Sequence, residues 1–189
     1  MSAAPPLNDR AALAAIAARI TRPVVLVGLM GVGKSTVGRK LAAMLQRDFV
    51  DADEAIVAAA RRSIPEIFET FGEAFFRDGE RRVIARLIDE GHGVIATGGG
   101  AFVDPTTRAA VLERGIAVWI DCDIDTLVER TSRRGNRPLL KQGDPREILT
   151  RLAKERAPFY GQAHIRVVSE TGPHADTARA IIEAIDQWL

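Results

Sequence analysis

The chain has 189 residues, 47% of them hydrophobic, and its 26 basic and 25 acidic side chains leave a formal net charge of +1. This length and composition predict one domain with a sizeable core. The balanced charge gives no reason to expect a general attraction to nucleic acid or to an anionic membrane surface. No window approaches 18 consecutive apolar residues, so we expect no membrane-spanning helix.

The first 22 residues are predicted to form an extension that precedes a single domain at 23–189. Met1 to Asp9 contains two prolines and is typical of a loose tail. Ala11 to Ile20 has apolar residues at helical spacing, which predicts a short amphipathic helix. The one cysteine, Cys122, allows no intramolecular disulfide and suits a reducing compartment, so we expect a cytoplasmic protein.

A strand, a glycine-rich turn and a helix are predicted between Val24 and Leu45. The apolar run from Val24 to Gly28 is typical of a strand buried on both faces. The turn matches G-x-x-x-x-G-K-[ST], in which glycines let backbone N–H groups converge on phosphate oxygens. Lys34 is then expected on the β- and γ-phosphates of a nucleoside triphosphate, and the Ser35 hydroxyl on Mg²⁺. The predicted nucleotide-binding residues of this loop are Gly31, Val32, Gly33, Lys34, Ser35 and Thr36.

Strands and helices alternate through the rest of the chain. A helical stretch that starts at the capping-box sequence SIPE is expected to break near Gly72 and to end before Gly91. The closing helix is expected to turn its three isoleucines and Trp188 inward. Strands are also predicted at 49–51, 94–97, 117–120 and 165–168, and helices at 63–90, 105–115, 123–133, 145–159 and 175–189. This pattern predicts a three-layer α/β/α fold, with a five-stranded parallel sheet, helices on both faces and ligands at the carboxyl ends of the strands.

Charged residues near the predicted strand ends indicate a second substrate. Asp51 and Asp53 follow the second strand, and strand periodicity places them on one side. Asp51 is expected beside the metal, whereas Asp53 is suited to binding hydroxyl groups. Arg77 and Arg156 lie on separate predicted helices, and two guanidinium groups suit a carboxylate because their donors pair with its oxygens. The sequence therefore predicts a small hydroxylated acid as the phosphoryl acceptor.

Two further segments are expected to border this site. Three consecutive glycines, Gly98 to Gly100, follow the third strand, which implies that something approaches their backbone closely. The stretch 130–143 is rich in arginine and turn residues and is predicted to form a mobile lid. The acceptor-binding segment is placed at about 51–90.

Six motifs together resemble the shikimate kinase family. They are GLMGVGKST at 28–36, DADEAI at 51–56, FRDGE at 76–80, ATGGGA at 96–101, RGNRPLL at 134–140 and ERAPFY at 155–160. Their order and approximate spacing match that family over residues 23–189. The resemblance implies the fold of P-loop small-molecule kinases, which is similar to that of nucleoside monophosphate kinases. It also implies transfer of a phosphoryl group from ATP to the 3-hydroxyl of shikimate, giving shikimate 3-phosphate on the way to chorismate and the aromatic amino acids.

On the nucleotide side, the resemblance implies roles for individual residues. Lys34 would polarise the ATP phosphates, and Ser35 and Asp51 would hold one Mg²⁺ ion and its water shell. Arg137, in the predicted lid, would close over the γ-phosphoryl group, and Arg130 would lie against adenine. Such catalysis requires positioning and charge stabilisation but no covalent enzyme intermediate.

On the acceptor side, the resemblance implies that Asp53 binds ring hydroxyls and draws the proton from the attacking one. Arg77 and Arg156 would clamp the shikimate carboxylate, with Glu80 orienting Arg77. Gly98 to Gly100 would pack against the ring. Single-domain members of this family commonly act as monomers, so the only partner expected is the small-molecule substrate.

Two other functions stay open from the sequence. A gluconate-type kinase shares the P-loop architecture and phosphorylates a hydroxylated acid, although the TGGG sequence and a missing histidine–proline pair argue against it. A catalytically silent regulatory module would have kept nucleotide binding and lost the reaction, but such proteins usually lose the P-loop lysine, which is present as Lys34. The lack of an N-K-x-D sequence, which reads guanine in GTPases, weakens the interpretation of the chain as a GTPase. His92, His164 and His174 lack metal-ligand spacing, so none is assigned to a metal.

Overall fold

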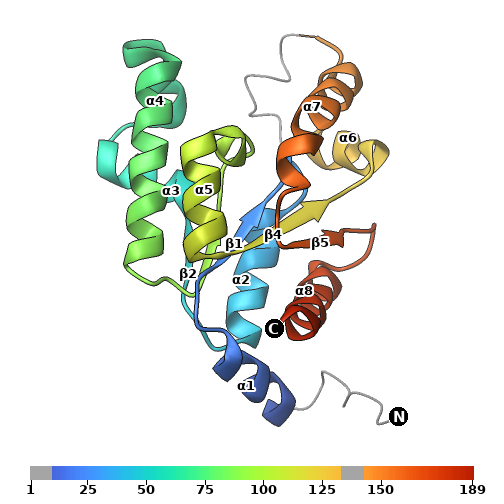
Figure 1. The fold of residues 1–189 in the computed structure, drawn as a ribbon. Coiled ribbons are helices and arrows are strands. Elements are labelled where there is room, and N and C mark those ends of the chain that lie inside the picture. The colour runs from blue at the N-terminus through green and yellow to red at the C-terminus, as the bar shows by residue number, and fades with distance from the viewer. Residues whose placement is uncertain (1–9, 133–142) are drawn as a thin grey trace.

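The computed structural model describes residues 10–132 and 143–189 (Figure 1). The predicted tail, Arg137 and most of the segment 130–143 lie outside the described residues. In chain order the elements are α1 (Arg10–Arg19), β1 (Val24–Val27), α2 (Lys34–Met44), β2 (Phe49–Asp51), α3 (Ala52–Ala60), α4 (Ile64–Asp89), β3 (Val94–Ala96), the 3₁₀ turn η1 (Ala101–Val103), α5 (Pro105–Arg114), β4 (Ile116–Asp121), α6 (Ile124–Ser132), α7 (Pro145–Tyr160), β5 (Ile165–Val168) and α8 (His174–Trp188).

Five parallel strands form one sheet in the order β2-β3-β1-β4-β5. β1 lies in the middle and is buried along its length, with Val25 paired to Ile95 of β3 and to Ala117 of β4. Helices cover both faces of the sheet (Figure 1). The predicted fold class is therefore confirmed, and the carboxyl ends of the strands meet at one edge. In the described part of the chain, no helix has both the length and the apolar character needed to cross a membrane.

Helix α4 begins at the capping box that the sequence predicts. The Glu66 amide donates to Ser63 Oγ at 3.3 Å, and the Ser63 amide donates to the Glu66 carboxylate at 2.7 Å. Backbone groups that would otherwise lack partners at the helix start are thus satisfied. Gly72, with φ 82° and ψ 172°, interrupts the helix where expected, so Arg77 lies in the second helical stretch of α4.

Residues 52–60 form helix α3, so the strand periodicity assumed for Asp51 and Asp53 is wrong. Asp51 ends β2 and caps this helix, because its Oδ1 accepts the N–H groups of Asp53 at 2.9 Å and Glu54 at 3.4 Å. Asp53 consequently lies in the first turn of α3. Both carboxylates still line the same cavity, since β2 ends at the edge of the sheet where that cavity lies.

The closing helix α8 buries Ile181, Ile182 and Ile185 as predicted. Trp188, however, is 38% exposed, so its predicted inward position is wrong. Because the helix ends at this residue, only part of the Trp188 ring contacts other side chains. These are the His164 ring, with a centroid separation of 5.1 Å, and the Arg22 guanidinium, 5.5 Å from the ring centroid.

Helix α1 packs against the rest of the molecule. Ile16 and Ile20 belong to the hydrophobic core. Arg47, which follows α2, donates to the carbonyl of Ala17 at 2.9 Å and also to that of Ile20. These contacts hold α1 at the amino-terminal end of the strands. The boundary at residue 22 between an extension and the main domain stays a prediction.

Candidate active site

A cavity of about 230 Å³ lies at the carboxyl ends of β1, β2 and β3. The loop after β1, the last residue of β2 and the loop after β3 all contribute to its walls. The predicted site residues that line it are Gly31, Gly33, Lys34, Ser35, Thr36, Asp51, Asp53, Gly98, Gly99 and Arg130. The structure therefore brings the predicted nucleotide loop and metal-side residues together with part of the predicted acceptor site.

The loop after β1 has the backbone form of a phosphate cradle. Gly33 precedes α2 with φ 95°, a left-handed conformation that glycine adopts at little cost. Lys34 is 8% exposed, and its Nζ donates to the carbonyl oxygens of Gly28 at 2.7 Å and Leu29 at 2.8 Å. The ammonium group thus lies over the loop at the start of α2, where the helix dipole also favours an anion. Val32 is buried, so its contact with a nucleotide would be through the main chain.

Ser35 and Asp51 offer oxygen atoms to a cation beside this loop. Ser35 Oγ donates to Asp51 Oδ2, while Oδ1 of the same carboxylate accepts the amides at the start of α3. Hydroxyl and carboxylate oxygens are ligands that Mg²⁺ prefers, and this ion usually adds phosphate oxygens and several water molecules. The chemistry of this donor pair therefore fits one Mg²⁺ ion.

The glycines after β3 lie directly against charged groups of the predicted acceptor site. A Cβ atom on Gly98 would stand 2.9 Å from Glu80 Oε1 and 3.0 Å from Asp53 Oδ1. A Cβ atom on Gly100 would stand 2.9 Å from both terminal nitrogens of Arg77. Any larger residue at either position would have to displace a charged group. The requirement for glycine here is therefore one of space.

The middle glycine of this loop is held by α7. The Gly99 carbonyl accepts hydrogen bonds from Arg156 Nη1 at 2.8 Å and from the Tyr160 hydroxyl. Tyr160 is 1% exposed, and burial raises the pKa of its hydroxyl, which stays a donor at neutral pH. Arg156 therefore reaches the glycine loop from α7, whereas Arg77 reaches it from α4.

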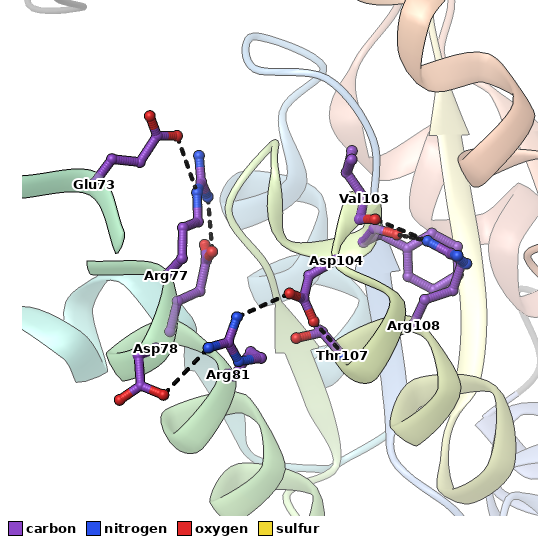
Figure 2. A network of polar contacts seen from close by, with 10 residues as sticks. Glu73, Arg77, Asp78, Arg81, Val103, Asp104, Thr107 and Arg108 are labelled. Atoms are coloured by element: carbon purple, nitrogen blue, oxygen red, sulfur yellow. Dashed lines mark hydrogen bonds and ion pairs between the residues drawn. The ribbon is translucent and has the colours of Figure 1, made fainter. Parts of the chain in front are cut away.

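Arg77 is held by carboxylates of its own helix (Figure 2). Its Nη1 donates to Glu80 Oε2 at 2.7 Å, and its Nε lies 3.5 Å from Glu73 Oε1. Burial raises the pKa of Glu80, which is 3% exposed, and the adjacent charge of Arg77 opposes that rise. Burial acts to lower the pKa of Arg77, but Glu80 and Glu73 together outweigh this effect and raise it. The guanidinium group is therefore both charged and oriented.

Arg130 lines the cavity and links two loops. Its Nη1 donates to the Val32 carbonyl at 3.2 Å and to the Ser169 hydroxyl at 3.3 Å, and its Nη2 donates to the Glu170 carbonyl at 2.9 Å. The guanidinium group thus joins the phosphate loop to the residues after β5. Its contact with adenine stays a prediction, as does the role of Arg137.

Residues that the sequence analysis did not single out as ligands also line the cavity, and they are Met30, Thr97, Thr131 and His174. The His174 ring lies against the phosphate loop, with Cε1 3.0 Å from the place that a Cβ of Gly33 would take. The sequence carries a signal for this position, because TGPH follows the fifth strand and parallel strands end at one edge. Thr97 donates to the Leu26 carbonyl at 2.9 Å, a link between neighbouring strands that no spacing reveals.

The fold and the site together define a class of protein. A parallel sheet carries a phosphate-binding loop after its central strand, with a serine–aspartate pair beside that loop and two arginines on separate helices nearby. This is the arrangement of a P-loop phosphotransferase that acts on a small molecule.

Comparisons with known proteins narrow the class to a family. The family model described as shikimate kinase matches residues 30–186. A shikimate kinase of Novosphingobium aromaticivorans is 65% identical over 178 residues, covering 92% of this chain and 92% of that protein. One of Paramagnetospirillum magneticum is 53% identical over 174 residues, covering 92% of this chain and 89% of that protein. The solved structure of a shikimate kinase from Acinetobacter baumannii in complex with shikimate has a TM-score of 0.84 and 39% identity, covering 88% of this chain and 93% of that one.

The chain belongs to the shikimate kinase family. The resemblance carried by the six motifs is thereby confirmed, and the protein is a kinase that uses ATP as its co-substrate.

Proposed function

We propose that the chain transfers the γ-phosphoryl group of ATP to the 3-hydroxyl of shikimate, giving shikimate 3-phosphate and ADP in the route to the aromatic amino acids. The observation that carries this proposal is the arrangement around Gly98 to Gly100. Arg77 and Arg156 reach this loop from two helices, and Asp53 lies against it beside the phosphate loop. The family and the relative solved with shikimate support the same acceptor.

Shikimate offers a carboxylate and ring hydroxyl groups to this site. The guanidinium groups of Arg77 and Arg156 pair with the carboxylate oxygens, which fixes one end of the ring. Asp53 accepts a hydrogen bond from the attacking hydroxyl and takes its proton as the oxygen becomes a phosphate ester. Gly98, Gly99 and Gly100 have no side chains, so the ring can lie close to their backbone.

ATP binds with its phosphates on the loop amides from Gly31 to Thr36. Lys34 exchanges its loop carbonyl partners for phosphate oxygens, and its charge balances the charge that develops on the leaving oxygen. Ser35 and Asp51 would hold a Mg²⁺ ion, which would supply further positive charge to the phosphates. Arg137, which lies outside the described residues, is assigned to the transferring γ-phosphoryl group. Exclusion of water from the site would prevent the hydrolysis of ATP. The enzyme acts as a cytoplasmic monomer in this proposal.

The test measures ADP release with ATP and Mg²⁺ against shikimate and gluconate in parallel, and identifies the product by mass spectrometry. We expect turnover with shikimate only, and a loss of about 10²-fold or more in Asp53→Ala. Asp125→Ala, which removes a carboxylate that is 78% exposed on α6, is the matched control and should keep its turnover. Turnover with gluconate alone would overturn the acceptor, and no turnover with either acid would favour a silent regulatory module.

A further inference from the structure

The segment from Gly98 to Asp104, which we call the glycine loop, lies between the two helices that carry the predicted carboxylate-binding arginines. Its first residues touch Arg77 of α4 and Arg156 of α7. The separation of the two guanidinium groups consequently depends on where this loop sits. Two further sets of contacts, both at the far end of the loop, fix its position.

The first set ties the loop to α4 (Figure 2). Asp104 Oδ2 accepts a hydrogen bond from Arg81 Nη1 at 3.0 Å, and Arg81 lies one helical turn after Arg77. Nη2 of Arg81 donates to Asp78 Oδ1 at 3.2 Å. Asp104 also caps α5, because its Oδ1 accepts the Thr107 amide at 2.9 Å. Burial acts to raise the pKa of Asp104, but the bonds from Thr107 and Arg81 outweigh it and hold that pKa below its ordinary value.

The second set ties the same end of the loop to α7. Arg108 Nη1 donates to the carbonyl oxygens of Phe102 at 3.1 Å and Val103 at 2.9 Å (Figure 2). Its Nε donates to Gln162 Oε1 at 3.1 Å, and its guanidinium lies 5.0 Å from the centroid of the Phe159 ring. Phe159 follows Arg156 by one helical turn. One turn after Arg77, Arg81 thus contacts the glycine loop directly. One turn after Arg156, Phe159 contacts it through Arg108.

We propose that Asp104 and Arg108 are positioning residues of the acceptor site, which hold the glycine loop between α4 and α7 and thereby set the spacing of Arg77 and Arg156 for a single carboxylate. The inference rests on the proposed function, because it concerns the same acceptor. Neither residue lines the cavity at the phosphate loop, so ATP binding should not depend on them.

The test compares the KM for shikimate with the KM for ATP in Asp104→Asn and Arg108→Met. The Asp104→Asn variant would keep an oxygen for the Thr107 amide and would lose the ion pair with Arg81. We expect each variant to raise the KM for shikimate about 10-fold and to leave the KM for ATP within about twofold. The matched control is Asp89→Asn, which breaks the ion pair between Asp89 of α4 and Arg114 of α5, outside the acceptor site. This control should change neither KM.

A second readout is specific to the carboxylate. Wild-type protein should bind shikimate more tightly than an analogue whose carboxylate is reduced to an alcohol, and Asp104→Asn and Arg108→Met should narrow that difference. Equal increases in both KM values, or the same effect in Asp89→Asn, would overturn the proposal. If Asp104→Asn fails to fold, Arg81→Gln decides the comparison, since it leaves the cap of α5 intact. Absence of shikimate turnover by the wild-type protein would contradict the proposed function. Normal wild-type turnover together with unchanged KM values in the variants would contradict this inference alone.

Discussion

The hydroxyl of Ser35 donates a hydrogen bond to Oδ2 of Asp51, and this contact joins the start of α2 to the residue that caps α3. Oδ1 of the same carboxylate holds the amide of Asp53. One side chain thus connects the phosphate loop, the proposed Mg²⁺ ligands and the first turn that carries the proposed base. A change at Asp51 that keeps an oxygen for the cap of α3 should therefore affect metal use more than it affects the fold.

Asp51→Asn is expected to raise the Mg²⁺ concentration needed for half-maximal turnover by about 10-fold or more, because a metal-side carboxylate is lost while an oxygen remains for the cap. The measurement is the initial rate against free Mg²⁺ at saturating ATP. Asp123→Asn, which changes the equivalent cap of α6, should leave the Mg²⁺ dependence unaltered. An unchanged half-saturation point in Asp51→Asn would contradict the assigned role.

Gly100→Ala should lower activity and Gly79→Ala should raise stability, although both add one methyl group. The new Cβ at position 100 would stand 2.9 Å from the Arg77 terminal nitrogens, so the flexible guanidinium must move. We expect a loss of about 10-fold or more in kcat/KM for shikimate with little change in the melting temperature. At Gly79 nothing lies within 4 Å of the added atom, so the helix should gain about 0.5–1 kcal/mol and activity should persist. Equal activity in the two variants would argue against Arg77 as a ligand.

Arg156→Lys should raise the KM for shikimate by about 10-fold or more, because an ammonium group cannot pair bidentately with a carboxylate while also bonding to Gly99. The KM for ATP should change little. Arg151→Lys, on the same helix with a side chain that is 68% exposed, is the control. Titration calorimetry with shikimate measures the effect directly, and equal affinities in the two variants would rule out a clamp at Arg156.

The His92 side chain predicts a pH dependence of stability. Its Nδ1 contacts the Asp48 carboxylate and its Nε2 lies 3.1 Å from Glu90 Oε2. The hydrogen bond with Asp48 raises the pKa of His92 above the ordinary 6.5, although burial opposes the rise. The protonated form is therefore stabilised by folding, and this contribution is complete below about pH 6.5 and is lost as pH rises through the folded-state pKa.

Denaturant unfolding of the wild type and His92→Gln checks this sign. The difference in unfolding free energy, in favour of the wild type, should be larger near pH 6 than near pH 9, since the charge on His92 is then present. Asp48→Asn should reduce the dependence on pH. The same difference at both pH values would show that the charge of His92 contributes nothing.

Much of the fold follows from local sequence. β1 and β4 are apolar runs that only a buried central strand accommodates, and the caps at Ser63 and Asp104 fix the starts of α4 and α5. Helix α3 is not predicted, because strand periodicity is carried beyond Asp51 to Asp53. An aspartate followed by an alanine-rich run is the stronger signal, since the aspartate can cap the helix that alanine favours.

Fewer contacts of the candidate site can be predicted from the local sequence. The contact of Arg77 with Glu80 follows from their three-residue spacing on a helix. By contrast, Arg81 and Asp104 are 23 residues apart, and Tyr160 and Gly99 are 61 residues apart. Only the packing of α4 and α7 around the glycine loop brings such pairs together, so no pattern in the sequence shows them.

Helix α8 runs from the active site toward α1 (Figure 1). Its first residue, His174, lines the cavity, and its 15 residues span about 22 Å, ending where Asp186 pairs with Arg19 of α1. Leu189 consequently lies at the end of α8 that is away from His174 and the cavity; the position marked C in Figure 1 is this residue. The protein can therefore be immobilised on a sensor surface through Leu189 with the cavity facing solution.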